Sequence, residues 1–117
     1  MGTMIFSSVD QFLQELSLLN DELFPESRLE TVYSRLDKVS LRLVMSAALF
    51  VDIYFNAENG RLDFTLIHNN KRVFGYDNLK NWHRHPHENP EKHIECAQPT
   101  LRQIVQETAS VIASFQK

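Results

Sequence analysis

Four of the five histidines lie within eleven residues of one another, at His83, His85, His87 and His93. The first three are spaced by two, so in an extended backbone their imidazoles point to the same side, and Pro86 favours extended geometry at His85. A neutral imidazole binds metal or accepts a proton near neutral pH, whereas a charged one donates hydrogen bonds to phosphate. The spacing therefore indicates metal binding or acid–base chemistry.

Metal binding is one interpretation of this pattern, because imidazole and carboxylate groups hold zinc and other divalent metals. The candidate ligands are His83, His85 and His87, with Asp77, Glu88 or Glu91 completing the coordination shell. A second interpretation assigns no chemistry to the histidines. They then cap, stack and form hydrogen bonds within a polar, solvated connection between elements.

Acid–base catalysis on an RNA phosphodiester is the third interpretation. One histidine takes the proton of the 2′-hydroxyl and another protonates the leaving 5′ oxygen, and such proton transfers are each worth about 10² to 10⁴ in rate. We assign this pair to His83 and His93, with His85 in support. Arg84 is expected to hold the phosphate, and Lys92 offers a second cation that stabilises its charge. This interpretation predicts an endoribonuclease that needs no cofactor.

The residues just before the histidines indicate how a substrate could be held. Tyr76 and Trp82 can stack on an unpaired base, although Tyr76 can equally end a strand in the core and Trp82 can pin the loop to the domain. Asp77 and Asn78 suit a turn, in which Asp77 can also orient a histidine ring. Gly75, beside a strand end, indicates a bulge or a close backbone approach.

Composition limits the kind of protein that carries this site. A chain of 117 residues suits one domain, and its longest apolar run, Ala47–Val51, is far below the roughly 18 to 20 residues that cross a bilayer. The first residues lack the features of a signal peptide, so we expect a cytoplasmic protein with no membrane partner. Cys96 is the only cysteine, which excludes an internal disulfide. The net charge of −3 does not favour nucleic acid, but residues 71–85 carry four bases against one acid.

Hydrophobic periodicity predicts the elements that must position the histidines. Apolar residues three and four apart predict helices over residues 8–20 and 99–115, each with a Ser or Thr followed three residues later by Gln. Alternating apolar residues predict about five strands over residues 28–76, joined by Asn-Gly and Asn-Asn turns. Residues 77–98 lack this periodicity and are expected to form a loop. The sequence thus predicts one α+β domain, an antiparallel sheet of about five strands with both helices packed on one face.

One part of the chain resembles a known family. The run from Arg72 to Asn78, RVFGYDN, the His- and Pro-rich tract after it and a terminal helix opening at Pro99 are similar to the toxin component of TumE-type toxin-antitoxin pairs, small prokaryotic proteins. The likeness covers about residues 49–114. Members of that family end the loop in a dense PHHKH cluster, whereas residues 90–93 here read PEKH.

The resemblance implies a growth-inhibitory toxin with ribonuclease activity, whose partner is a small antitoxin with a DNA-binding module. The positions that match the family's motif are Tyr76, Asp77, Asn78, His83, His85 and His93. The alternative is a non-catalytic binding module that uses a sheet edge or a helix face to engage a partner or a second copy of itself, with histidines that respond to metal or pH. Each catalytic expectation requires the imidazoles to converge on one accessible pocket beside a cation.

Overall fold

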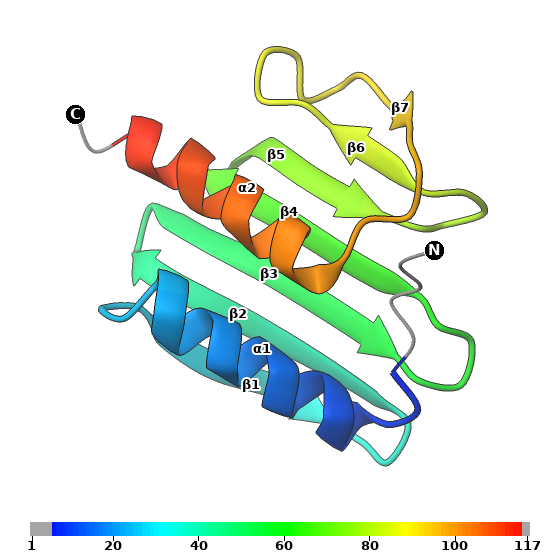
Figure 1. The fold of residues 1–117 in the computed structure, drawn as a ribbon. Coiled ribbons are helices and arrows are strands. Elements are labelled where there is room, and N and C mark those ends of the chain that lie inside the picture. Colours follow the sequence, from blue (N-terminus) through cyan, green and yellow to red (C-terminus); the bar gives the residue numbers. More distant parts are fainter. Residues whose placement is uncertain (1–5, 116–117) are drawn as a thin grey trace.

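A computed structural model describes residues 6–115 as two layers, an antiparallel sheet and two helices that lie against one of its faces (Figure 1). In chain order the elements are α1 (Val9–Leu23), β1 (Arg28–Ser34), β2 (Lys38–Ser46), β3 (Leu49–Asn56), β4 (Leu62–His68), β5 (Lys71–Asp77), β6 (His83–His85), β7 (Ile94–Glu95) and α2 (Leu101–Ser114). Most of the segment considered above for a signal peptide, residues 1–5, lies outside the described residues. Among residues 6–115 no helix has the length and apolar character needed to cross a membrane.

The strands follow one another across the sheet in chain order, and every neighbouring pair is antiparallel. Tight turns allow this meander. Asn69 and Asn70 join β4 to β5 with φ of 52° and 65°, and Gly60 precedes β4 with φ of 78°. Asn and Gly adopt these left-handed conformations at low cost. The predicted positions of both turns are confirmed.

Both helices begin at the predicted capping residues. At the start of α1 the Ser8 hydroxyl accepts a hydrogen bond from the Gln11 amide at 3.1 Å, and Thr100 and Gln103 form a reciprocal capping box at the start of α2. Helix α1 continues three residues beyond its predicted end and stops before Phe24-Pro25. A proline there cannot continue the helix because it lacks an N–H donor.

The predicted α+β class and the packing of both helices on one face are confirmed, but the sheet has seven strands rather than about five. The additional strands are β6 and β7, and both lie in the segment expected to be a loop. Strand β6 reads His83-Arg84-His85, so its alternation is between polar residues. A search for alternating apolar residues has no signal to find in such a strand.

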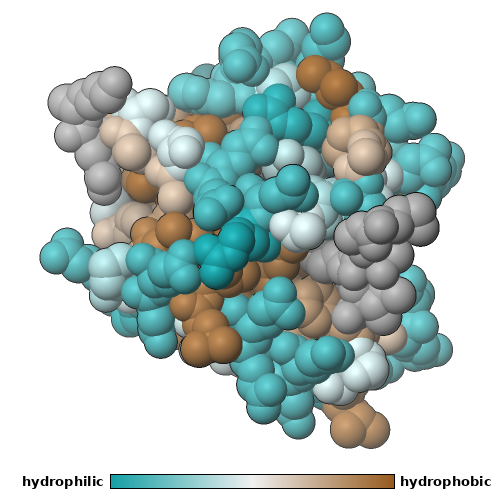
Figure 2. Space-filling model, viewed as in Figure 1, coloured by the Kyte–Doolittle hydropathy of each residue, from teal (hydrophilic) through white to brown (hydrophobic). Residues whose placement is uncertain are grey.

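Alternation along the strands divides the sheet into a helix face and an open face. The helix face carries large apolar side chains such as Leu41, Ile53 and Phe64, which pack beneath Phe12 of α1 and Ile104 of α2. The open face is defined by the alternate, mostly polar positions Arg42, Asp52, Tyr54, Asp63, Thr65, Arg72, Gly75, Asp77, His83 and His85. In Figure 2, viewed on the helix side, apolar residues gather in the band around and between the helices and hydrophilic ones surround them.

Gly75 occupies a crowded position at the centre of β5. A Cβ atom there would lie 2.7 Å from the backbone oxygen of Phe64, so only glycine fits without a shift of the chain. The register between β4 and β5 slips in the same region, where Leu66 pairs with Phe74 but Ile67 pairs with Arg72. The expected close approach at Gly75 is therefore confirmed, whereas the bulge lies two residues away, at Val73.

Candidate functional site

The open face brings three of the five histidines together. His83 and His85 alternate with Arg84 along β6, so both imidazoles lie on this face, opposite Asp77 and Gly75 of β5. The chain then turns over residues 86–92 and returns His93 to the same place. The His93 ring centroid lies 4.4 Å from that of His85 and 5.9 Å from that of His83, and both ring pairs meet edge to face.

His85 is the fixed member of this cluster. Its side chain is 3% exposed, and its Nε2 lies 2.9 Å from a carboxylate oxygen of Asp77. Its Nδ1 lies 3.2 Å from both Nη1 of Arg72 and the backbone oxygen of Pro90. A neutral ring that donates to Asp77 accepts from Arg72 at Nδ1, whereas a protonated ring donates to Asp77 and Pro90. In either state both ring nitrogens of His85 have hydrogen-bond partners, so the ring is held in place. It can therefore position the His93 ring that packs against it.

Arginines supply the positive charge of the site. Arg61 and Arg72 line a pocket of about 300 Å³, here called the histidine pocket, whose walls are Arg61, Asp63, Thr65, Arg72, Asp77, Leu79, His83, His85 and His93. Nη2 of Arg61 donates to Asp63 at 2.9 Å, but its Nε is buried and has no hydrogen-bond partner within residues 6–115. Arg72 is exposed and touches His85. A phosphate entering the pocket would meet both guanidinium groups.

Asp63 is the acidic wall of the pocket, and burial raises its pKa. The Arg61 guanidinium opposes this shift, while the negative charge of Asp77 adds to it. The two carboxylates face one another across β4 and β5 as a register pair. Their proximity lowers the affinity of the site for further negative charge, and the two arginines offset that effect.

Arg84 and Tyr76 lie on the helix face, on the other side of the sheet from the histidines. Both bind Glu107 of α2: the Tyr76 hydroxyl donates to Oε1 at 2.5 Å, and Arg84 donates to Oε2 through Nε at 2.6 Å and through Nη2. Burial and this hydrogen bond raise the pKa of Tyr76, and the Glu107 carboxylate raises that of Arg84. The expected contacts of Arg84 with phosphate and of Tyr76 with a base in the same pocket therefore do not fit this geometry.

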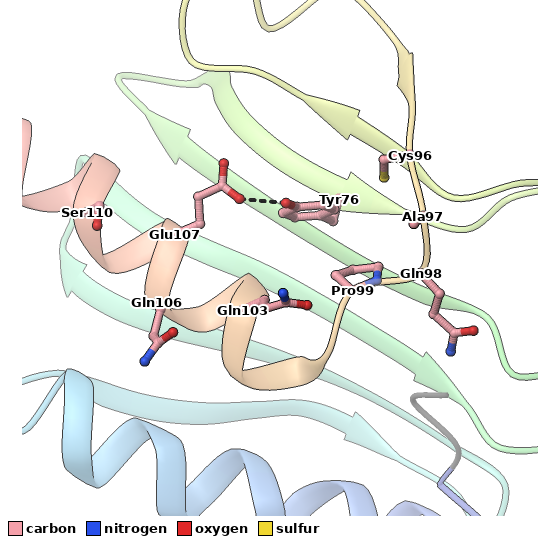
Figure 3. Close-up of a pocket in the computed structure, with 9 residues that line it drawn as sticks. All are labelled: Tyr76, Cys96, Ala97, Gln98, Pro99, Gln103, Gln106, Glu107 and Ser110. Carbon is pink, nitrogen blue, oxygen red and sulfur yellow. Dashed lines mark hydrogen bonds between the residues drawn. The ribbon is translucent and has the colours of Figure 1, made fainter. Parts of the chain in front are cut away.

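Figure 3 shows the groove of about 440 Å³ that Tyr76 and Glu107 line, between α2 and the segment that follows β7. Cys96 lies at its edge, and partial burial raises the pKa of its thiol. A thiol is a poor nucleophile while it stays protonated. This groove shares no lining residue with the histidine pocket, and burial does not favour the thiolate of Cys96.

The other expected substrate-binding and orienting residues have structural surroundings. Trp82 packs against the hydrophobic core, and the side chain of Lys92 is exposed. Asn78 holds the loop before β4, because its Oδ1 accepts from the amide of Leu62 at 2.8 Å and its Nδ2 donates to the oxygen of Gly60 at 2.9 Å. Asp77 has the orienting position considered for it, on His85.

The expected metal ligands are not assembled. His87 lies against Phe115, with ring centroids 5.3 Å apart, and does not line the histidine pocket with His83 and His85. Within residues 6–115 no group of three or more His, Cys, Asp and Glu side chains is placed to hold a metal ion. Strands β4, β5 and β6, with His93 from the segment before β7, instead bring imidazoles, carboxylates and guanidinium groups together. Such a cluster is suited to proton transfer beside a bound anion.

Arg61, Asp63 and Arg72 were not expected in the site. Asp63 lies between Leu62 and Phe64, and this alternation predicts that its side chain faces away from the core. That the histidines lie on the same face follows only from the pairing of β6 with β5, which the sequence does not predict. Plain alternation from Asp77 would put Arg72 on the helix face, and the bulge moves it to the open face.

Comparisons with family models, with curated proteins and with solved structures found no match. The class of the protein therefore follows from its own geometry: over residues 6–115 it is an α+β domain in which neither helix covers one face of the sheet, and that face carries a cluster of histidines and arginines.

Proposed function

We propose that this protein is an endoribonuclease that cleaves single-stranded RNA by acid–base catalysis in the histidine pocket. The observation that supports the proposal best is the convergence of His83, His85 and His93 with Arg72 and Arg61 in one pocket. A polar connection without function would not need the His93 ring against those of His83 and His85 in a pocket with two guanidinium groups. The rings of His83 and His93 are close enough to contact the same phosphate.

In the proposed reaction, His83 and His93 exchange protons with the substrate. The neutral imidazole takes the 2′-hydroxyl proton, O2′ attacks phosphorus, the bond from phosphorus to O5′ breaks, and the protonated imidazole gives its proton to O5′. The products are a 2′,3′-cyclic phosphate and a 5′-hydroxyl. Arg72 and Arg61 stabilise the charge that builds on the phosphoryl oxygens. His85, held by Asp77, keeps the His93 ring in place.

The biological setting of this activity is also part of the proposal. The resemblance of residues 49–114 to TumE-type toxins supports a cytoplasmic toxin of a type II pair, neutralised by a small antitoxin with a DNA-binding module. RNA cleavage fits this setting, because loss of intact RNA stops growth. Expression of the parent should stop growth, His83→Ala should not, and co-expression of the adjacent antitoxin gene should restore growth in the parent.

The direct test uses a DNA oligonucleotide that contains one ribonucleotide, together with the all-DNA strand of the same sequence. The purified parent should cleave only the first and leave a cyclic phosphate, with EDTA present. His83→Ala and His93→Ala should each lower the rate by about 10² to 10⁴. His87→Ala is the matched control, since this exposed histidine of the same segment lies outside the pocket.

Three results would contradict the mechanism. If the parent leaves the ribonucleotide strand intact, the protein is not this ribonuclease and the non-catalytic alternative is favoured. If His83→Ala and His87→Ala cleave equally fast, the activity resides elsewhere. Loss of cleavage on adding EDTA would replace the acid–base scheme with a metal-dependent one.

A further inference from the structure

A second hollow lies beside the histidine pocket on the open face. It has a volume of about 290 Å³ and is lined mainly by Arg42, Asp52, Tyr54, Asp63 and Thr65. Asp63 and Thr65 line the histidine pocket as well, so the two hollows adjoin along β4, and together they are called the groove. Neither helix packs against this face (Figure 1). A ligand in the histidine pocket therefore has a path across β4 to β3.

Aromatic rings and arginines are paired along this groove. The Arg42 guanidinium lies 4.2 Å from the centroid of the Phe50 ring, and that of Arg61 lies 5.9 Å from the centroid of Tyr54. Arg42 also contacts Asp52, but the pair is more than two-fifths exposed, so water screens it and the guanidinium can exchange partners. Rings that accept stacked bases and guanidinium groups that track phosphates are the two components of single-strand binding sites.

Register puts Tyr54 in line with the catalytic histidine. Tyr54, Asp63, Asp77 and His83 are successive partners across β3, β4, β5 and β6, all on the open face. Three steps of about 4.8 Å between strands separate the ends of this row, about 14 Å in all. A nucleotide strand can lie across the sheet with its scissile phosphate at His83. The base over Tyr54 would then belong to the next nucleotide beyond the two that flank this phosphate.

We propose that the hollow at Tyr54 is a nucleobase subsite, in which the unpaired base of the nucleotide beyond the two that flank the scissile phosphate stacks on the Tyr54 ring while Arg61 or Arg42 contacts the phosphate that connects it. The inference rests on the proposed ribonuclease activity and specifies its substrate as single-stranded RNA of at least three nucleotides. A duplex cannot present an unstacked base to the ring, so it should bind weakly.

The test compares kcat/KM for a dinucleotide with that for trinucleotides extended by one base on the 5′ or the 3′ side. One extension should raise kcat/KM about tenfold, the gain expected from a single stacked base. In Tyr54→Ala this gain should disappear, and in Tyr54→Phe it should persist because the ring is retained. Tyr33→Ala is the matched control: Tyr33 is an exposed tyrosine that lines neither hollow, and its loss should leave the gain unchanged.

A binding measurement separates failure of the subsite from failure of the ribonuclease proposal. The Kd of an uncleavable 2′-O-methyl trinucleotide should be about tenfold weaker for Tyr54→Ala than for the parent. If no RNA is cleaved but this difference is found, the ribonuclease proposal falls and the subsite stands. If RNA is cleaved but Tyr54→Ala keeps both the gain and the parent's Kd, the subsite is refuted and the ribonuclease remains.

Discussion

Among single residues of the site, Asp63 has the least favourable environment for its charge. Its carboxylate is partly buried, lies opposite Asp77 and has one arginine partner, and its pKa is raised as a result. A raised pKa means that the folded protein holds this proton more tightly than the unfolded chain. Ionised Asp63 therefore costs stability at every pH above its raised pKa. That cost fades as pH falls and is absent below the ordinary aspartate value of about 4.

Asp63→Asn should accordingly raise Tm at pH 7, by up to about 4 °C, the shift that 1 kcal/mol produces in a domain of this size. The difference from the parent should shrink as pH falls and vanish near pH 3.5, where both states of the parent carry the proton. Thermal melts across this range check the prediction. Asp52→Asn is the control, because its more exposed carboxylate on the same face should give no such gain. A constant difference at all pH values would show that charge is not the cause.

At this scale the sequence predicted the imidazoles but not their surroundings. Spacing by two correctly indicated that His83 and His85 share a side but wrongly included His87, while the turn over residues 86–92 brings His93 to them. The same alternation puts Arg84 on the opposite side, so its assignment to the phosphate was inconsistent with this pattern, whereas Arg72 reaches the histidines only because of a bulge. Gly75 indicated a bulge or a close approach, but the position of the bulge at Val73 depends on the pairing between strands, and that position decides which face Arg72 takes.

At the scale of elements, α2 holds β6 in place from behind. Glu107 accepts hydrogen bonds from Arg84 of β6 and from Tyr76 of β5, so one carboxylate ties the helix to both strands. The Arg84 and Glu107 side chains are 29% and 30% exposed, which leaves them only partly screened by water. Because Arg84 is fixed on the helix face, His83 and His85 on either side of it are directed to the open face.

Glu107→Ala should destabilise the protein by about 1 to 3 kcal/mol, since it leaves the Arg84 charge and the Tyr76 hydroxyl without their partner. It should also slow RNA cleavage, because β6 loses its anchor, although Glu107 lies outside the histidine pocket. Chemical denaturation and kcat/KM measure the two effects. Arg102→Ala removes the exposed ion pair with Glu22 and should change neither appreciably. Equal effects of the two substitutions would contradict the anchoring role.

Elements with apolar periodicity were predictable, and those without it were not. The helices and β2 to β5 each bury one face, so their apolar residues recur with periods of 3.6 and 2. Strands β6 and β7 contribute few apolar side chains, since one side of β6 forms the histidine pocket and the other carries Arg84. Strand β6 pairs with β5, and β7 pairs with β6, so both depend on neighbours in space rather than on a local apolar pattern.

At the scale of the whole molecule, one hydrophobic core supports every element that carries the site. Both helices pack on the helix face, and Ile104 of α2 is fully buried there among residues from strands that also present open-face groups. A shared core of this kind couples the stability of the helices to that of the sheet. The site edge formed by β6 and β7 is small, and its attachment depends on β5 and on Glu107.

Ile104→Ala should lower stability by about 2 to 5 kcal/mol and Tm by about 8 to 20 °C, because it leaves a cavity in this core. Trp82 is the only tryptophan, and it lies at the start of β6 against the core, so its fluorescence reports on the site edge while far-ultraviolet circular dichroism reports on the whole chain. If the molecule is one cooperative unit, the two melting curves coincide in the parent and move together in Ile104→Ala. A tryptophan transition that precedes the loss of helix, and that does not move with Ile104→Ala, would show instead that β6 and β7 open as a separate unit. The histidines would then be assembled only when that edge is closed.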